Sequence, residues 1–228
     1  MSASTSSFKL AALEPGDRMN ATEFRRRDSV TSDRYKTELI EGVVHMAAAV
    51  RVEHGRCQGL IAGLLNEYCS ETPGTDTAAD ATARLDEANE PQPDVSAFIV
   101  AECGGRTRID DDGYLVGGPE LLVEVSHATD AVDRGIKRRV YELHGVAEYA
   151  VWRIGLGLIE WYRLRDDQLV LTPPDDDGVY RSNVLPGFWL NVAAAVAINR
   201  VAVLETLRQG LASPQHATFV DHLARYQR

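Results

Sequence analysis

Residues 119–148 read PELLVEVSHATDAVDRGIKRRVYELHGVAE, and this stretch decides the fold. Its opening, ELLVEVS, predicts a buried strand because Leu121, Leu122, Val123 and Val125 are apolar. Asp133 is a good N-cap for the helix that follows, Val140 and Leu143 give that helix an apolar face, and Gly145 supplies its end. The next stretch, EYAVWRI, predicts another strand. Strand, helix and strand in this order indicate an α/β fold.

The segments on either side of this unit predict a mixed central β-sheet flanked by helices. The expected elements are a short helix from about Asn20 to before Ser29, two strands in TELIEGVVHMA turning at Gly42, a helix over 52–70, a strand in PDVSAFIV at 93–100, further strands over 148–185, and helices from about 191 with a break near Ser213. No repeat or linker divides the chain. We therefore expect a loose tail over residues 1–15, one domain over 16–192 and a C-terminal helical extension over 193–228.

The composition is that of a soluble globular protein. Of 228 residues, 44% are hydrophobic and 25% are charged. The formal charge of -10 means that the surface as a whole repels nucleic acid and anionic membrane, so phosphate must be handled at a local basic site or through a metal ion. The three cysteines lack CxxC spacing, which argues against a disulfide framework and a zinc ribbon. With no signal peptide or membrane span, we expect a cytoplasmic protein without a membrane partner.

Two carboxylates are candidates for a metal site. Asp94 stands at the mouth of one predicted buried strand, and Glu124 lies among apolar neighbours inside the next. An ionised Glu in such a strand is costly to desolvate unless a cation or hydrogen-bond donors meet it. If the two strands are neighbours, both side chains can share Mg²⁺ or Mn²⁺, which prefer oxygen ligands. The pattern leaves open the alternative that Glu124 faces solvent or pairs with an Arg.

A basic run, DRGIKRRVY at 133–141, follows Glu124 closely in an otherwise acidic chain. Lys137 and Val140 are three residues apart and lie on about the same side of the predicted helix, so Lys137 is the best candidate to point inward. Arg138 and Arg139 would then meet solvent. The alternative is a solvated basic helix face.

Together these motifs resemble the Uma-two family of restriction endonuclease-like proteins in the PD-(D/E)xK nuclease superfamily. The resemblance rests on EPQPDVSAFIV, on GGPELLVEVSHATDAVDRGIKRRVYELHGVAEYAVW, on RYKTELIEGVVHMA upstream and on LPGF downstream, and it covers about residues 20–192. It implies a restriction-endonuclease-like core with an N-terminal β-hairpin and C-terminal helices. It also implies a Mg²⁺-dependent endonuclease that hydrolyses phosphodiester bonds of nucleic acid, with DNA the expected substrate.

The resemblance also assigns roles to residues. Asp94, Glu124 and the carbonyl of Val125 match metal ligands, and Lys137 matches the lysine that orients the attacking water. Glu41 matches an acidic residue that completes the metal site, with Glu38 as the weaker alternative. Ser126 stands where the superfamily usually has its lysine. His54 stands where the family often has a histidine; the alternative is that His54 is only the histidine at the start of a helix and binds no ligand. Ala150 and Arg153 depart from the family, which commonly has Trp and Asp there.

Two other functional classes remain open from the sequence. One is a catalytically inactive nuclease-fold protein that serves as a binding or dimerisation module. The other is a metal-dependent hydrolase of a different phosphate ester. The expected partners are nucleic acid, bound weakly and locally, and a second copy of the chain in a homodimer, with the C-terminal extension either covering the core or forming the dimer contact.

Overall fold

The computed structural model describes residues 10–32, 35–47, 49–127 and 129–226, and its centre is a six-stranded sheet. The strand order is β11-β10-β9-β8-β5-β3. The strands are β3 (Thr75–Ala79), β5 (Val95–Ile99), β8 (Leu121–Ser126), β9 (Glu148–Arg153), β10 (Leu158–Arg165) and β11 (Gln168–Thr172). In this sheet β8 and β9 run parallel, while the other neighbours are antiparallel. The predicted mixed sheet is therefore confirmed.

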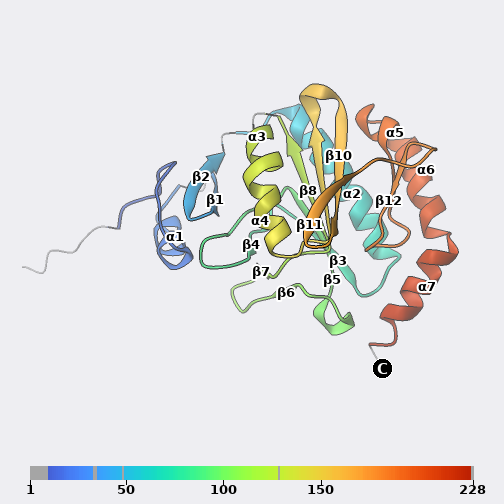
Figure 1. Cartoon of the computed structure of the whole chain (residues 1–228), viewed down its shortest axis with the longest axis horizontal. Helices are drawn as coiled ribbons and strands as arrows, with labels where there is room; N and C mark the ends of the chain where they lie inside the picture. Colours follow the sequence, from blue (N-terminus) through green and yellow to red (C-terminus); the bar gives the residue numbers. More distant parts are fainter. Residues whose placement is uncertain (1–9, 33–34, 48, 128, 227–228) are drawn as a thin grey trace, which may run out of the picture.

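The two faces of the sheet are covered by different helices (Figure 1). On one face, α2 (Val52–Ser70) lays a stripe that includes Ile61 and Leu65 against Val95 and Val123. On the other face, Tyr141 of α4 (Arg138–Leu143) packs with Leu122 and Tyr149. Both faces of β8 are thus covered, which explains why its burial runs without a break along the strand.

The connection from β8 to β9 is helical but differs from the expected helix. It begins with α3 (Asp130–Val132), continues through a π-helical turn, η2 (Asp133–Lys137), and ends in α4. Asp133 is not an N-cap, because it lies inside the helix and is buried. Leu143 was expected on the apolar face but is 78% exposed. Leu143 is the last residue of α4, and the buried face of that helix is formed by Val140 and Tyr141.

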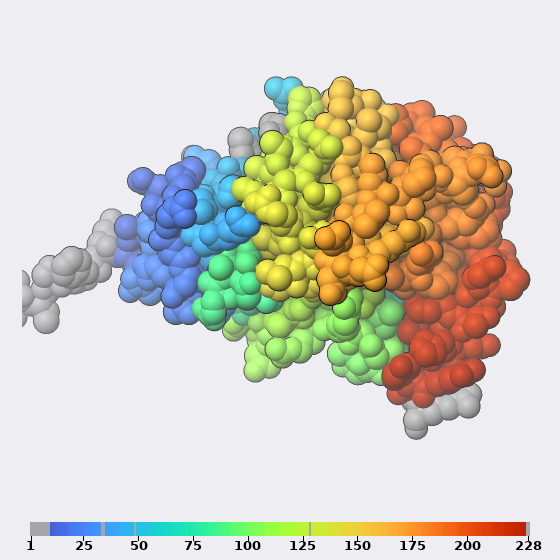
Figure 2. All heavy atoms as spheres, in the orientation of Figure 1, coloured from blue at the N-terminus to red at the C-terminus, as the bar shows by residue number. Residues whose placement is uncertain are grey.

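The N-terminal elements form a small unit at one end of the molecule (Figures 1 and 2). It consists of α1 (Ala21–Asp28), capped by Asn20, and the hairpin of β1 (Lys36–Ile40) and β2 (Val43–Ala47). Of the expected loose tail, residues 1–9 lie outside the described residues, whereas Leu13 is buried beside Phe24 in this unit.

A three-stranded sheet that the sequence did not predict lies below the hairpin. Its order is β4-β7-β6, from β4 (Ala83–Arg84), β6 (Arg108–Ile109) and β7 (Leu115–Val116), and the 3₁₀ turn η1 (Ala101–Cys103) precedes β6. Strands of two residues are too short for an alternating pattern, so the sequence there indicated only weak strand character or a loop.

The C-terminal elements pack on the same face of the central sheet as α2 and extend its core. They are β12 (Val179–Arg181), β13 (Trp189–Asn191), α5 (Val192–Val196), α6 (Arg200–Leu211) and α7 (Pro214–Leu223). The 3₁₀ turn η3 (Ile154–Leu156) lies earlier, between β9 and β10. The predicted helical break near Ser213 is present, with Ser213 as the N-cap of α7. Val203 and Leu207 of α6 are fully buried in the larger core cluster. Among the described residues, no helix is long and apolar enough to cross a membrane.

Candidate functional site

The sheet places Asp94 opposite Glu124. Val95 pairs with Val123 in the antiparallel register of β5 and β8, so the next pair outward is Asp94 with Glu124. Directly opposite residues of an antiparallel pair point to the same face and lie close together. Two carboxylates in that arrangement repel each other, so the fold must supply positive charge or hydrogen-bond donors around them.

Asp94 receives three such partners. Its Oδ2 accepts a hydrogen bond from the Val125 backbone amide at 2.7 Å and lies 3.2 Å from His54 Nε2. Its Oδ1 accepts a hydrogen bond from Lys36 Nζ at 3.0 Å. Burial alone would raise the pKa of Asp94, but the His54 hydrogen bond, the Lys36 charge and the Val125 amide together hold that pKa well below its usual range. Asp94 is therefore an ionised carboxylate.

Glu124 is buried, with 3% of its surface exposed. Its Oε1 accepts hydrogen bonds from Lys137 Nζ at 3.0 Å and from the Tyr141 hydroxyl at 2.9 Å. Burial raises the pKa of Glu124; the Lys137 charge opposes this rise, and the nearby Asp94 and Asp133 carboxylates add to it. Glu124 therefore gains a proton more readily than an ordinary Glu.

Lys137 lies at the centre of three carboxylates. Besides Glu124, its Nζ is 2.7 Å from Glu38 Oε1 and 3.8 Å from Asp133 Oδ1. The side chain is 4% exposed, as expected from its inward position, whereas Arg139 is 58% exposed. Burial opposes the charged form, but the Glu124, Glu38 and Asp133 carboxylates outweigh it and raise the pKa of Lys137 well above its usual value. Lys137 is thus a buried cation.

Glu41 does not join this cluster, contrary to the expectation that it completes the metal site. It lies in the two-residue turn of the hairpin with a φ of 50°, and its Oε1 is 3.5 Å from Arg139 at the surface. Such turns require positive φ at both central residues, so Glu41 and Gly42 turn outward while the strand before them points Glu38 to Lys137. The weaker alternative, Glu38, occupies the place expected for Glu41.

Sequence reasoning missed three groups of the cluster. Lys36 stands two residues before Glu38 and so shares its side of the strand. Asp133 lies four residues before Lys137, and Tyr141 lies four residues after Lys137. For Asp133 and Tyr141 the spacing was a usable signal, since positions four apart share a helix face. His54 proves to contact Asp94, which favours the functional over the merely terminal interpretation of this residue.

Apart from Tyr141, the side chains of the cluster line a cavity of about 450 Å³ that opens between the hairpin, α2 and the β8–β9 connection. Four carboxylates face two lysine ammoniums in the cluster, namely Asp94, Glu124, Glu38 and Asp133 against Lys36 and Lys137. The formal balance, with His54 neutral, is minus two. Either protons or a divalent cation can compensate such a buried excess.

The donor set fits a magnesium-type ion held jointly with substrate. Among the described residues, no three His, Cys, Asp or Glu side chains form a group that could hold a metal ion by themselves. Mg²⁺ in phosphoryl-transfer sites is commonly held by only one or two carboxylates, with water and substrate phosphate as its remaining ligands. Asp94 and Glu124 are two such carboxylates on the wall of one cavity.

Comparisons with known proteins agree with the fold. The profile of a family named Uma2, described as "Putative restriction endonuclease", matches residues 21–193. A crystal structure of "a putative nuclease belonging to DUF820 from Anabaena variabilis ATCC 29413" has the same fold, with a TM-score of 0.56 at 13% sequence identity over 71% of this chain and 89% of that chain. A search among curated proteins finds no match.

Proposed function

Since the Uma2 profile spans most of the chain, the protein belongs to that family, and on this premise we propose that it is a metal-dependent endonuclease that hydrolyses phosphodiester bonds of nucleic acid, DNA in the first instance. The membership confirms the resemblance inferred from the sequence. The observation that carries the proposal is the buried cluster in which Asp94 and Glu124 face one cavity with Lys137 bonded to Glu124.

Asp94, Glu124 and the carbonyl of Val125 would hold Mg²⁺ or Mn²⁺. When bound, the ion supplies Lewis-acid polarisation of the scissile phosphate and lowers the pKa of a water molecule. Asp94 suits this role because its lowered pKa keeps it ionised. Glu124 suits it because a cation replaces the proton that its buried position otherwise favours.

The two lysines have different tasks in this proposal. Lys137 keeps Glu124 oriented from the buried side, and it orients the attacking water from the same position. Lys36, whose side chain is 22% exposed against 4% for Lys137, is the cation that a substrate phosphate can reach. Charge that builds on phosphorus is then stabilised by groups already held in place.

Substitutions at the cluster test the activity. We expect Glu124→Gln and Lys137→Ala to lower Mn²⁺-dependent cleavage of DNA by at least about 100-fold, because each removes a charge on which the transition state depends. Arg139→Ala is the matched control, since Arg139 belongs to the same helix and is 58% exposed. Full cleavage by both cluster variants, in preparations free of contaminating nuclease, would overturn the proposal.

Metal binding provides a second measurement that does not depend on activity. We expect titration calorimetry with Mn²⁺ to show binding by the wild-type chain and none by Asp94→Asn or Glu124→Gln. Absence of binding by the wild type at millimolar Mn²⁺ would instead favour a non-catalytic module that keeps the nuclease fold.

A further inference from the structure

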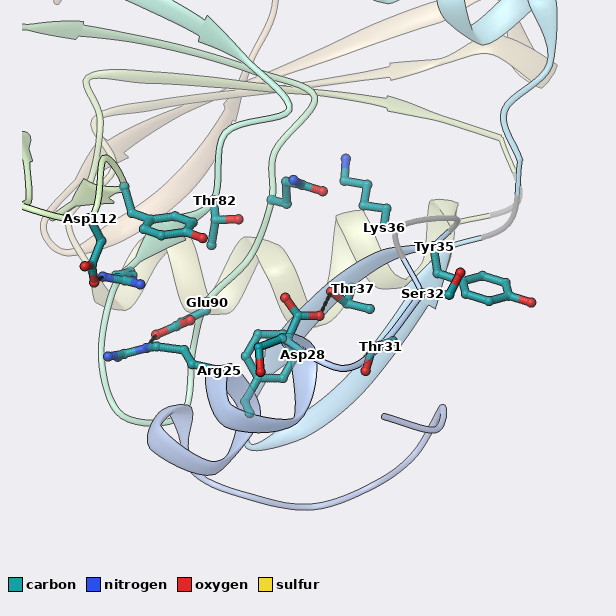
Figure 3. A pocket seen from close by; sticks show the side chains of 15 residues that line it. Arg25, Asp28, Thr31, Ser32, Tyr35, Lys36, Thr37, Thr82, Glu90 and Asp112 are labelled. Carbon is teal, nitrogen blue, oxygen red and sulfur yellow. Dashed lines mark hydrogen bonds and ion pairs between the residues drawn. The ribbon is translucent and has the colours of Figure 1, made fainter. Parts of the chain in front are cut away.

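A second cavity adjoins the candidate site. It measures about 610 Å³ and lies between α1 and β1 on one side and the segments around β4 and β7 on the other (Figure 3). Its volume lies within the range of about 300–1,000 Å³ typical of small-ligand sites. Lys36 lines both cavities, and its Nζ is 3.0 Å from Asp94 Oδ1. A ligand bound in this cavity would thus be separated from the Asp94 carboxylate only by the Lys36 side chain.

The charges on its wall are balanced. Three cationic and three anionic side chains line it, Arg25, Lys36 and Arg84 against Asp28, Glu90 and Asp112. Several of these pair with one another, since Arg25 Nε is 2.6 Å from Glu90 and Arg84 is 2.7 Å from Asp112. Such a wall offers little net attraction to a phosphate. With Gln92 and several hydroxyl groups beside these pairs, it suits a neutral ligand with hydrogen-bonding edges.

The cavity also holds an aromatic platform. Tyr114 lines it with 39% of its surface exposed, and the Arg84 guanidinium lies 3.9 Å from the centre of the Tyr114 ring. Asp110 and Asp112 fix that guanidinium by ion pairs of 2.5 and 2.7 Å. Tyr35, by contrast, points away from the cavity (Figure 3). Tyrosine rings and arginine planes held in this way are surfaces on which nucleobases stack.

We propose that this cavity receives an unpaired nucleobase next to the phosphate that is cleaved, with Lys36 contacting the phosphate between the two cavities. The inference rests on the proposed nuclease function and deepens it by naming the substrate class. A base enters a side cavity only when it is out of the duplex stack, and removing it from a paired strand costs a few kcal/mol. The preferred substrate is therefore single-stranded or locally unpaired nucleic acid.

Binding in EDTA separates this inference from catalysis. The probes are a fluorescent 12-nucleotide single strand of mixed sequence, an abasic strand of the same length and the corresponding duplex, each titrated with the full chain by anisotropy. We expect the base-bearing single strand to bind about tenfold more tightly than the other two, as one stacked base contributes roughly 1–3 kcal/mol.

Variants of the platform supply the controls. Tyr114→Ala is expected to lower single-strand affinity to the abasic level, while Tyr114→Phe retains the preference because its ring still stacks. Tyr226→Ala, which removes a ring that is 53% exposed on the C-terminal side, should leave all three affinities unchanged. Thermal melting of each variant checks that it is folded.

Three results would overturn the inference: equal affinity for the three probes, an unchanged preference in Tyr114→Ala, or no binding of any probe. Mn²⁺-dependent cleavage by the same preparation shows whether the proposed function falls with it. Cleavage without a base preference would leave the nuclease and remove the base-binding cavity.

Discussion

At the scale of single residues, the carboxylates of the cluster are held together by the buried ammonium group of Lys137. Lys137 contacts Glu38 and Glu124 within hydrogen-bonding distance, and Asp133 lies slightly farther away. A buried charge network of this kind contributes little when intact but is costly to break, since each partner left behind is a desolvated charge. The integrity of the network therefore depends on every one of its charges.

Removing the Lys137 charge should expose this dependence. We expect Lys137→Met to lower the free energy of unfolding in EDTA by about 3–5 kcal/mol, because three carboxylates lose their cation. Urea denaturation provides the measurement. Arg139→Met, at an exposed position on the same helix, should change it by no more than about 0.5 kcal/mol. Equal effects would mean that the network is solvated.

Asp94 should give stability a pH dependence of definite sign. Its pKa is lower in the folded chain than the usual value of about 3.9 in an unfolded chain, so ionised Asp94 stabilises the fold above pH 4, and this contribution is lost as the pH falls further. In EDTA, wild type should exceed Asp94→Asn by about 2 kcal/mol at pH 6, with the difference shrinking between about pH 4 and pH 2. A difference that grows on acidification would contradict the assignment.

Residue chemistry also sets how much of the candidate site was predictable. Asp94, Glu124 and Lys137 were found because a charge in an apolar strand or beside one requires a partner. Glu41 was assigned from the family resemblance, whereas the turn expected at Gly42 carries Glu41 away from Lys137 and leaves Glu38 on the strand beside it. Lys36 was missed since its partner, Asp94, is 58 residues away and only the docking of the hairpin joins them.

At the scale of elements, order and type followed from the sequence wherever a segment was long enough to show a period. Helix α2 has the predicted bounds, Val52–Ser70, and β8 lies within ELLVEVS. The π turn of η2 was not predictable, because it inserts one residue without any pattern of its own. The strands β4, β6 and β7 were equally hidden, since their pairing is set by tertiary contacts.

Helix α6 offers a test of whether the C-terminal extension covers the core. Leu207 is fully buried, whereas Val201, six positions earlier, is 67% exposed. We expect Leu207→Ala to cost about 2–5 kcal/mol of unfolding free energy through the cavity it leaves. Val201→Ala should change it by about 0.5 kcal/mol or less. If both are neutral in chemical denaturation, the extension is an appendage and not part of the core.

At the scale of the whole molecule, the charge of -10 sets the terms of nucleic-acid binding. The arginines that line the second cavity are already paired, Arg25 with Glu90 and Arg84 with Asp110. The uncommitted positive charge is therefore small and local. The homodimer expected from the sequence stays a prediction.

The salt dependence of nucleic-acid binding should reflect this small amount of unpaired positive charge. For a single strand, the logarithm of affinity falls with the logarithm of salt concentration at about 0.7 per phosphate contacted. We expect a slope of about −1, corresponding to one or two phosphates, and a shallower slope in Lys36→Met. Anisotropy titrations from about 50 to 200 mM salt suffice. A slope steeper than about −4 would reveal a broad basic surface that the charge distribution does not suggest.

The two halves of the site differ in how far apart they lie along the chain. Glu124 and Lys137 are 13 residues apart, on one strand and the helical connection that leaves it, whereas Lys36 and Asp94 are separated by 58. Contacts between nearby residues close small loops and form early in folding, while distant ones wait for long segments to dock. We therefore expect docking of the hairpin to complete the site last in folding. Transient detachment of that hairpin would interrupt the site while the strand–helix unit remains folded.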